Sequence, residues 1–316
     1  MTLRDELLAT VASLYYKLNQ NQSQIATRLD MSASKVSRML KEAHERGIVE
    51  IHIRLPIPRD FALEQELIDT FGIKDAYVLQ TTDSSEHPVL IRSLGRLAAT
   101  YVELTVSELP DGQSIGASWS ESVYATFDAL PEKLARNVSV VQLAGGISAY
   151  GFDYTNLSQS VAAKLGGRHY LLHAPCAVER PDMRDMLLQE PMIRDVIARA
   201  GQVALAICGI GTMSQENSFV RSGLLSWEEI QALRAQGIVG EMCGTFYDLE
   251  GRYAQYDINQ RTIGVQLATL RTLPRVLAIA RGVSKAAAIA GALHGGFVKV
   301  LATDDLTARA VLEMGK

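Results

Sequence analysis

Residues 22–40 read QSQIATRLDMSASKVSRML. Apolar residues at helical spacing stop around Asp30 and then resume, which predicts two short helices joined by a tight turn. Asn21 with Gln24 three residues later is typical of a capping box at the start of the first helix, and Ser32 can cap the second. Asp30 tolerates the left-handed backbone that such a turn requires. The pattern therefore predicts helix-turn-helix geometry.

The second of these helices has an apolar face and a hydrophilic, basic face. Val36, Met39 and Leu40 are expected to hold it to the core. On the opposite face, hydroxyl groups and Arg38 can reach base edges in a major groove while lysines meet phosphates. The residues expected to face DNA are Gln22, Ser32, Ser34, Lys35, Ser37, Arg38 and Lys41. The alternative is an ordinary helical hairpin with a solvated charged face.

The flanking segments complete a small domain. Residues 3–18 read as an amphipathic helix, and VEIHIRL (49–55) alternates as a short strand or wing does. The apolar side of the helix is formed by Leu7, Leu8, Val11, Leu14, Tyr15 and Leu18. PIPRD (56–60) has two prolines and reads as a linker. We therefore expect a DNA-binding domain at 1–55, a linker at 56–60 and an effector-binding and oligomerisation domain at 61–316.

Charge and cysteine content narrow the class of protein. The net charge is −4, yet residues 1–55 hold eight Lys/Arg against six Asp/Glu. The N-terminal segment therefore carries a net positive charge, and the rest of the chain is acidic. The three cysteines are widely spaced and form no CxxC pair, which argues against disulfides and a zinc site. No apolar run is long enough for a membrane span, and the charged start does not suit a signal peptide. We expect a cytoplasmic protein without metal, cofactor or membrane contact.

From residue 61 onward, apolar strand-like segments alternate with amphipathic helical patterns, which predicts an α/β domain with a parallel, Rossmann-like sheet covered by helices on both faces. The expected strands are DAYVLQT (75–81), QSIGAS (113–118), VSVVQLAGG (138–146), RHYLLHAP (168–175), QVALAICGIG (202–211), RVLAIA (275–280) and FVKVLAT (297–303). Ligands of such sheets bind beyond the carboxyl ends of the strands.

Two strand-to-helix turns are rich in glycine or hydroxyl groups. In IGASWSESV (115–123), Gly116 permits a close turn, and three hydroxyl side chains beside a new helix can cradle a phosphate or simply cap the helix. Those hydroxyl residues are Ser118, Ser120 and Ser122. In LAGGIS (143–148), Gly145 and Gly146 allow either a ligand or a tight turn.

Two charged residues are further candidates. Lys285 falls in the first turn of a predicted helix, where a lysine is unfavourable unless an anion is near, or else it is a solvated surface lysine. Asp248 can accept hydrogen bonds from a polyol, or it can order its own turn. The segment CGIGTMS (208–214) lacks the third glycine of a dinucleotide fingerprint, so NAD binding is not expected.

Several motifs, taken in order, resemble one family. YYKLNQNQSQIATRLDMSASKVSRMLKEAHERGIVEI is followed by GASWSES, LAGG, GIGTMS, RSGLLS, GIVGEMCGTFYDLEG, LPRVLAIARGVSKAAAI and LATDDLTA. Together they resemble the SorC/DeoR-type sugar-binding transcriptional regulators across nearly the whole chain. The resemblance implies a large domain similar to sugar-phosphate isomerases and deaminases, a phosphorylated sugar as effector, operator DNA as partner and tetramers built as dimers of dimers.

By this resemblance, Ser118, Ser120 and Ser122 would hold the phosphate, Lys285 the phosphate or hydroxyls, and Asp248 the hydroxyls of the effector. The chain departs from the family in one loop. This loop usually reads Ala-Gly-Gly, but here Arg281 stands at the first glycine position. The arginine side chain either adds a phosphate contact or changes which effector fits.

The competing hypothesis is an isomerase or deaminase with an appended DNA-binding module. Such chemistry needs a convergent acid and base, and the sequence offers no clear pair. The sequence identifies neither the sugar, the operator, the target genes nor the sign of regulation.

Overall fold

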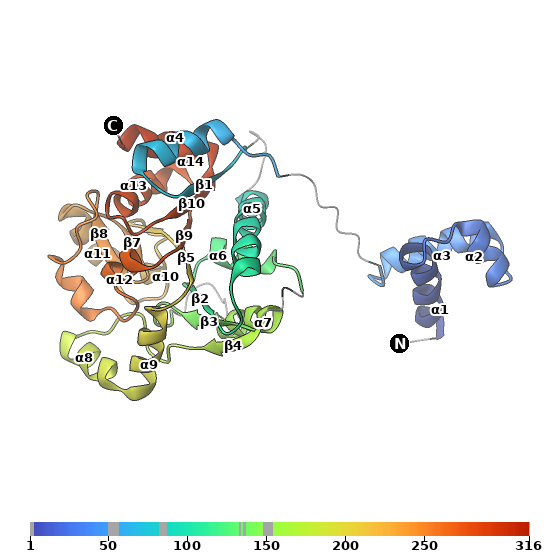
Figure 1. The fold of residues 1–316 in the computed structure, drawn as a ribbon, viewed down its shortest axis with the longest axis horizontal. Coiled ribbons are helices and arrows are strands. Elements are labelled where there is room, and N and C mark those ends of the chain that lie inside the picture. The colour runs from blue at the N-terminus through green and yellow to red at the C-terminus, as the bar shows by residue number, and fades with distance from the viewer. Residues whose placement is uncertain are drawn as a thin grey trace. The chain divides into compact units, whose positions relative to one another are not determined.

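A computed structural model describes residues 3–49, 57–81, 87–132, 134, 137–147 and 154–315 (Figure 1). The chain divides into two compact units, Met1–Pro56 and Ile57–Lys316. The strand expected at 49–55 lies outside the described residues except for Val49. Within the segment predicted as a linker, Arg59 pairs with Leu79, so its described part belongs to the larger unit.

The smaller unit is helical. Its elements are α1 (Leu3–Ala12), the π-helix η1 (Ser13–Lys17), α2 (Gln22–Arg28) and α3 (Ala33–Glu45). The predicted capping box is confirmed, since Asn21 and Gln24 each accept the other's backbone N–H at 2.9 Å. Ser32 caps α3 by accepting the N–H of Lys35 at 3.3 Å. Asp30 has φ = 50°, the left-handed conformation predicted for the turn.

One apolar core joins α1, α2 and α3. Its buried members are Leu8, Val11, Ala12, Leu14, Ile25, Ala26, Val36, Met39, Leu40 and Ala43. The prediction for Leu18 is wrong, because this side chain is 61% exposed. Its N–H binds the carbonyl of Ser13 five residues earlier, and a π-helical turn shifts the phase of the 3.6-residue repeat.

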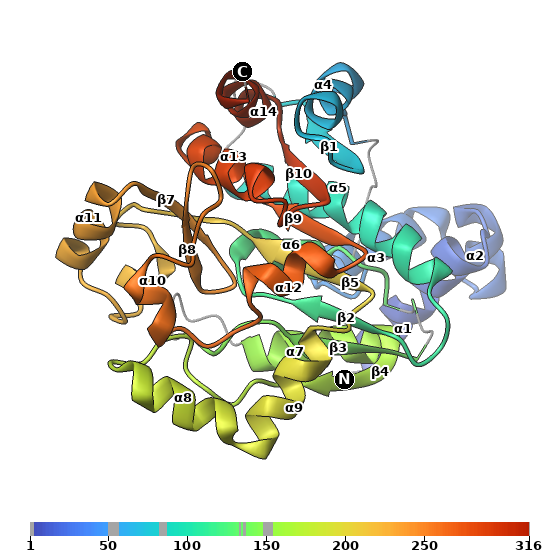
Figure 2. The ribbon, with the colours of Figure 1, turned by 60° about the vertical axis from the view of Figure 1, so that its left-hand side comes forward.

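The larger unit contains a sheet of seven parallel strands in the order β1-β10-β9-β5-β2-β3-β4 (Figure 2). The strands are β1 (Asp75–Leu79), β2 (Ser114–Ala117), β3 (Val138–Gln142), β4 (Gly166–Tyr170), β5 (Leu205–Gly209), β9 (Val276–Ile279) and β10 (Val300–Asp304). Each of the seven predicted strand segments contributes one of them. The segment around β4 differs from expectation because β4 is an exposed edge strand rather than a buried one.

Helices cover both faces of this sheet, as predicted for a parallel α/β fold. They are α4 (Phe61–Phe71), α5 (His87–Glu108), α6 (Glu121–Asp128), α7 (Tyr154–Leu165), α8 (Pro181–Gln189), α9 (Pro191–Ala200), α10 (Ser218–Arg221), α11 (Trp227–Ala235), η2 (Asp257–Arg261), α12 (Leu267–Thr272), η3 (Val283–Lys285), α13 (Ala286–His294) and α14 (Asp305–Met314). Alternate residues of a strand enter different cores: Ala206 and Cys208 face α9, α12, α13 and α14, whereas Leu205 and Ile207 face α5, α6 and α7.

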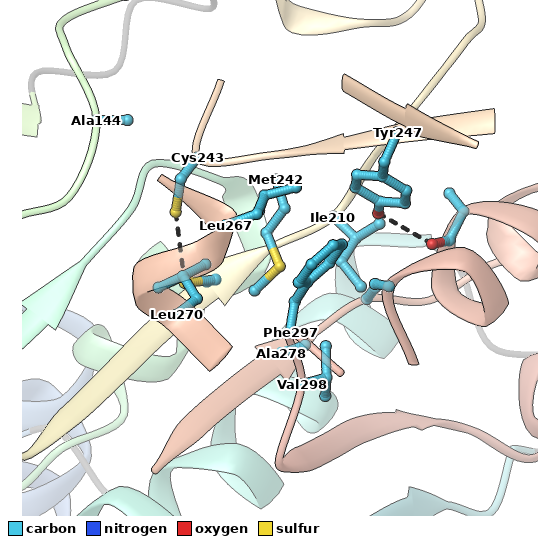
Figure 3. Close-up of a cluster of buried hydrophobic side chains, with 14 of the residues drawn as sticks. Ala144, Ile210, Met242, Cys243, Tyr247, Leu267, Leu270, Ala278, Phe297 and Val298 are labelled. Atoms are coloured by element: carbon cyan, nitrogen blue, oxygen red, sulfur yellow. Dashed lines mark hydrogen bonds between the residues drawn. The ribbon is translucent and has the colours of Figure 1, made fainter. Parts of the chain in front are cut away.

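A small antiparallel sheet, absent from the sequence prediction, packs over one of these cores. It consists of β6 (Gly211–Thr212), β7 (Ile238–Met242) and β8 (Thr245–Asp248). Cys243 and Gly244 join β7 to β8 with φ of 53° and 84°, as in a type I′ hairpin turn. Figure 3 shows Cys243, Met242 and Tyr247 among the buried side chains. The Sγ of Cys243 lies 3.6 Å from the Sγ of Cys208.

Candidate functional site

The order in which the chain lays down the strands reverses between β2 and β5. From β2 the sheet grows through β3 and β4, and from β5 it grows in the opposite direction through β9 and β10. In open parallel sheets, ligands bind at the carboxyl ends of the strands on either side of such a point. The segments that follow β2, β5 and β9 therefore form the candidate site.

The serines after β2 are largely engaged by the protein. Ser118 is 7% exposed, and its Oγ accepts the N–H of Gly209 at 3.1 Å, joining the ends of β2 and β5. Ser120 caps α6, since its Oγ accepts the N–H of Val123 at 3.1 Å. Each hydroxyl keeps its own hydrogen for a further acceptor. Ser122 is buried in the first turn of α6, so of the predicted cradle only Ser118 and Ser120 lie at the strand end.

Two of the predicted glycines, Gly116 and Gly145, allow close packing of the chain against itself. Gly116 lies within β2 and forms no turn, and a Cβ there would lie 2.5 Å from the Leu143 side chain. A Cβ on Gly145 would lie 2.3 Å from the carbonyl oxygen of Pro175. The N–H of Gly146 donates to the carbonyl of Ala174 at 2.7 Å. The close turn predicted at Gly116 is not formed, and Gly116 and Gly145 are required by close packing. A Cβ on Gly146 would meet only the Ala174 carbonyl at 3.8 Å, so packing does not account for this glycine.

Lys285 ends the short helix η3, directly before α13. Its Nζ donates to the carbonyl oxygen of Ile210 at 2.6 Å, which ties the end of β9 to the end of β5. Burial lowers the pKa of Lys285, and the nearby carboxylates of Glu241 and Glu121 oppose that shift. Lys285 is thus a half-buried cation held at the strand ends, and the alternative of a freely solvated surface lysine is wrong.

Glu241 is a residue of this site that the sequence analysis missed. It lies on β7, is 5% exposed, and accepts the N–H of Gly244 at 3.1 Å. A Cβ on Gly211 would lie 2.3 Å from its Oε1, so the glycine makes room for the carboxyl. Burial raises the pKa of Glu241 to about 7, against the lowering effects of the Gly244 hydrogen bond and of Lys285. The available signal was a single glutamate within the otherwise uncharged run GIVGEMCG.

Asp248 orders its own turn, and the prediction that it binds a polyol is not supported by its contacts. Its two carboxylate oxygens accept the backbone N–H and the Nε of Arg252, both at 2.8 Å, and the hydroxyl of Tyr256 at 3.2 Å. Burial raises the pKa of Asp248, but the hydrogen bonds from Arg252 outweigh burial and hold it below its ordinary value. The same carboxylate accepts the N–H of Glu250, so its acceptor positions are occupied within the turn.

The smaller unit presents a hydrophilic helix face. On α3 the exposed residues include Ser34, Lys35, Ser37, Arg38 and Lys41, whereas Gln22 on α2 is partly buried. The contacts of these side chains stay within the helix: Arg38 Nε donates to the Ser34 carbonyl at 3.4 Å, and Lys41 pairs with Glu45 at 3.8 Å. The opposite face of α3 is buried in the core, so the basic face points outward.

Two features are absent from the part of the chain that the structure describes. No cluster of three or more His, Cys, Asp or Glu side chains there is arranged to hold a metal ion. None of the described helices combines the length and apolar character needed to cross a bilayer.

Comparison with known proteins places the chain in a family. Residues 56–313 match the sugar-binding domain family. Over 311 residues the chain is 32% identical to the deoxyribonucleoside regulator of Bacillus subtilis (strain 168), covering 98% of each chain. It is 29% identical over 311 residues to the sorbitol operon regulator of Klebsiella pneumoniae, covering 97% of this chain and 98% of that one.

Solved structures agree in fold. The full-length Sorbitol Operon Regulator SorC from Klebsiella pneumoniae superposes with a TM-score of 0.76 at 29% identity, covering 97% of this chain and 98% of that chain. A DeoR family transcriptional regulator from Listeria monocytogenes superposes with a TM-score of 0.72 at 26% identity, covering 79% and 98%. These proteins are named as transcriptional regulators rather than enzymes. The chain belongs to the SorC/DeoR family of sugar-binding transcriptional regulators.

Proposed function

We propose that this regulator binds operator DNA through its smaller unit and a small phosphorylated sugar through its larger unit, and so controls an operon for carbohydrate or nucleoside use. The observation that carries the proposal is α3, a capped helix after a tight turn that buries one face and exposes hydroxyl and basic groups on the other. That is the arrangement of a recognition helix in a helix-turn-helix unit.

On the DNA side, Arg38 with Ser34 and Ser37 would read base edges, since guanidinium and hydroxyl groups pair with groups in the major groove. Lys35 and Lys41 would contact phosphates. Gln22 and Ser32, at the starts of α2 and α3, would lie against the backbone, where helix N-termini favour anions.

On the effector side, Lys285 would supply a half-buried positive charge. Glu241 would supply a carboxyl that can accept a hydrogen bond or keep its proton. The hydroxyls of Ser118 and Ser120 lie at the same strand ends, and their hydrogens would donate to an anionic oxygen. A phosphate suits this environment because the N-terminus of α6 is positive. A sugar attached to it would be held by the remaining polar groups.

Control of transcription would arise from coupling between the two units. If the effector favours one arrangement of the larger units, the spacing of the DNA-binding units changes, and about 1–3 kcal/mol of coupling is enough for a several-fold change in occupancy. Reading two half-sites requires at least a dimer, and we propose a homotetramer built as a dimer of dimers. Operator binding would take place in the cytoplasm.

The DNA-binding role is tested with duplexes that the full chain selects from a random-sequence pool. At one fixed salt concentration, R38A should lower affinity about tenfold or more and relax base preference. K41A should weaken binding to all sequences alike. When affinity is measured at several salt concentrations, the slope of log affinity against log salt concentration should be smaller by about one. R199A removes a guanidinium that pairs with Asp195 in the larger unit, and it should bind as the wild type does. Equal affinities for R38A and the wild type would count decisively against α3 as the recognition helix.

The effector is sought by thermal shift with matched pairs: ribose and ribose 5-phosphate, glucose and glucose 6-phosphate, fructose and fructose 6-phosphate. A ligand that binds only the folded state raises the melting temperature by mass action. We expect one phosphorylated sugar of these pairs to stabilise the wild type, whereas its free sugar does not. The same phosphorylated sugar should not stabilise K285M. K299M is the matched control, because Lys299 is also half-buried and donates to a backbone carbonyl, at the amino end of β10. Stabilisation by free sugars alone would overturn the phosphate assignment and leave the DNA-binding role intact.

A further inference from the structure

Arg281, which follows β9, is fixed by two acceptors on other elements. Its Nε donates to Asp304 Oδ2 at 3.1 Å, and its Nη1 donates to His87 Nδ1 at 2.9 Å. The side chains of Arg281 and Asp304 are only 14% and 3% exposed. Because the buried carboxylate compensates its charge, Arg281 is not placed as a spare phosphate contact, which was one of the two alternatives that the sequence left open.

The loop that contains Arg281 has further bonds to the same neighbours. The N–H of Ala280 donates to the carbonyl of Ala302 at 3.1 Å, and the N–H of Gly282 donates to the hydroxyl of Thr307 at 2.7 Å. Asp304 also caps α14 by accepting the N–H of Thr307 at 2.7 Å. The loop from β9 to Lys285 is thus held on the end of β10 and the start of α14.

The end of β10 is in turn joined to the point where the larger unit begins. Asp304 lies opposite Leu79 in the β1–β10 pairing, and Asp305 accepts the hydroxyl of Thr81 at 2.6 Å. Just before Thr81, the N–H of Gln80 donates to the carbonyl of Pro58 at 3.0 Å.

A second bond completes this attachment, from the N–H of Asp60 to the carbonyl of Val78 at 2.9 Å. Residues 58–60 and 78–81 together form what we call the linker anchor. It begins two residues after Pro56, the last residue of the smaller unit.

We propose that Arg281 is a positioning residue that makes the loop carrying Lys285 and the linker anchor move as one body. Arg281 bonds the loop to Asp304 at the end of β10, and the β1–β10 pairing and the bonds of residues 78–81 continue from there to residues 58–60. A displacement of Lys285 by an effector is then passed to the linker anchor instead of being absorbed in the loop. The regulatory meaning of this link rests on the proposed function, whereas the link itself does not.

The test is hydrogen exchange of the full chain without DNA or sugar. R281M keeps an unbranched apolar stem but removes the guanidinium and its donors. Amides of the linker anchor should then exchange about threefold faster or more, with β3 unchanged as the sign of an intact fold. R281K keeps the charge that Asp304 needs, but one ammonium cannot replace a guanidinium that donates to two separate acceptors. Its exchange should fall between those of the wild type and R281M.

The matched control is R275M. Arg275 lies at the opposite end of β9 and pairs with Glu108 at 3.6 Å, so exchange at the linker anchor should stay at the wild-type rate. The proposal is overturned if residues 280–285 exchange faster in R281M while the linker anchor does not. Should R281M fail to fold, the same pattern in R281K overturns it. Failure of the DNA or sugar-phosphate experiments leaves this measurement unaffected.

Discussion

Burial acts in opposite directions on Glu241 of β7 and on Lys285, which follows β9. It raises the pKa of the Glu241 carboxyl to about 7 and lowers the pKa of the Lys285 ammonium. In each case the charged form loses hydration that the partner's charge replaces only in part. An anionic ligand would stabilise the charged lysine and the protonated glutamate together, which suits a phosphate-binding site.

The raised pKa of Glu241 predicts how stability depends on pH. Between its ordinary value of 4.5 and about 7, the folded chain holds a proton that the unfolded chain releases. Stability of the larger unit should therefore fall as pH rises through this window, by up to about 3 kcal/mol. E241Q removes the titrating group, so it should flatten this part of the profile and be more stable than the wild type at pH 8.

Urea unfolding of the full chain at a series of pH values measures this difference. E250Q is the control, because Glu250 is exposed and pairs with Arg252. If E241Q and the wild type have parallel profiles between pH 4.5 and 7, the raised pKa is refuted.

Among the elements, the β7–β8 hairpin depends on its two-residue turn. Gly244 has φ = 84°, and a Cβ there would lie 2.9 Å from the Sγ of Cys176. G244A should therefore cost about 1–2 kcal/mol for the left-handed backbone and more for the collision. Gly237, just before β7, has φ = 90° with open space around it. G237A should cost only the backbone part, and equal losses in denaturant unfolding would contradict the proposed collision.

The parallel strands were predictable from sequence and the β7–β8 hairpin was not, for a physical reason. The parallel strands other than β4 were predicted because burial on both faces leaves near-continuous apolar runs. The hairpin was missed because its turn is Cys243-Gly244 instead of Asn-Gly or Asp-Gly, and its strands contain Gly240 and Glu241. The capping box of α2 was predicted because the residues involved are neighbours in the chain.

The site was less predictable because it depends on contacts between distant segments. Whether the Ser118 hydroxyl is available depends on Gly209, which is 91 residues away. Whether Lys285 is buried depends on Ile210 and on a hairpin that had not been recognised. Local pattern identifies the residue types at a strand end, but it does not show which of them the protein itself engages.

At the scale of the whole molecule, the two units have separate cores. The core of the smaller unit draws only on residues between Leu7 and Val49, and both cores of the larger unit begin after residue 56. Since each buried cluster of the described residues draws on one unit alone, we expect each unit to unfold by itself. A unit of 56 residues buries a smaller fraction of its surface than one of 260 residues, so the smaller unit is expected to melt first.

A chain truncated to residues 57–316 tests this separation. Its melting temperature should equal that of the upper transition of the full chain, because the truncation removes no member of its cores. Calorimetry of the two proteins measures the difference between these melting temperatures. The same sugar phosphate should raise the melting temperature of the fragment and that of the upper transition of the full chain by the same amount. The fragment should bind no operator. A melting temperature lowered by several degrees would mean that the smaller unit contributes contacts to the larger one. Coupling would then pass through an interface between the units, and the route through the linker anchor would be at most a part of it.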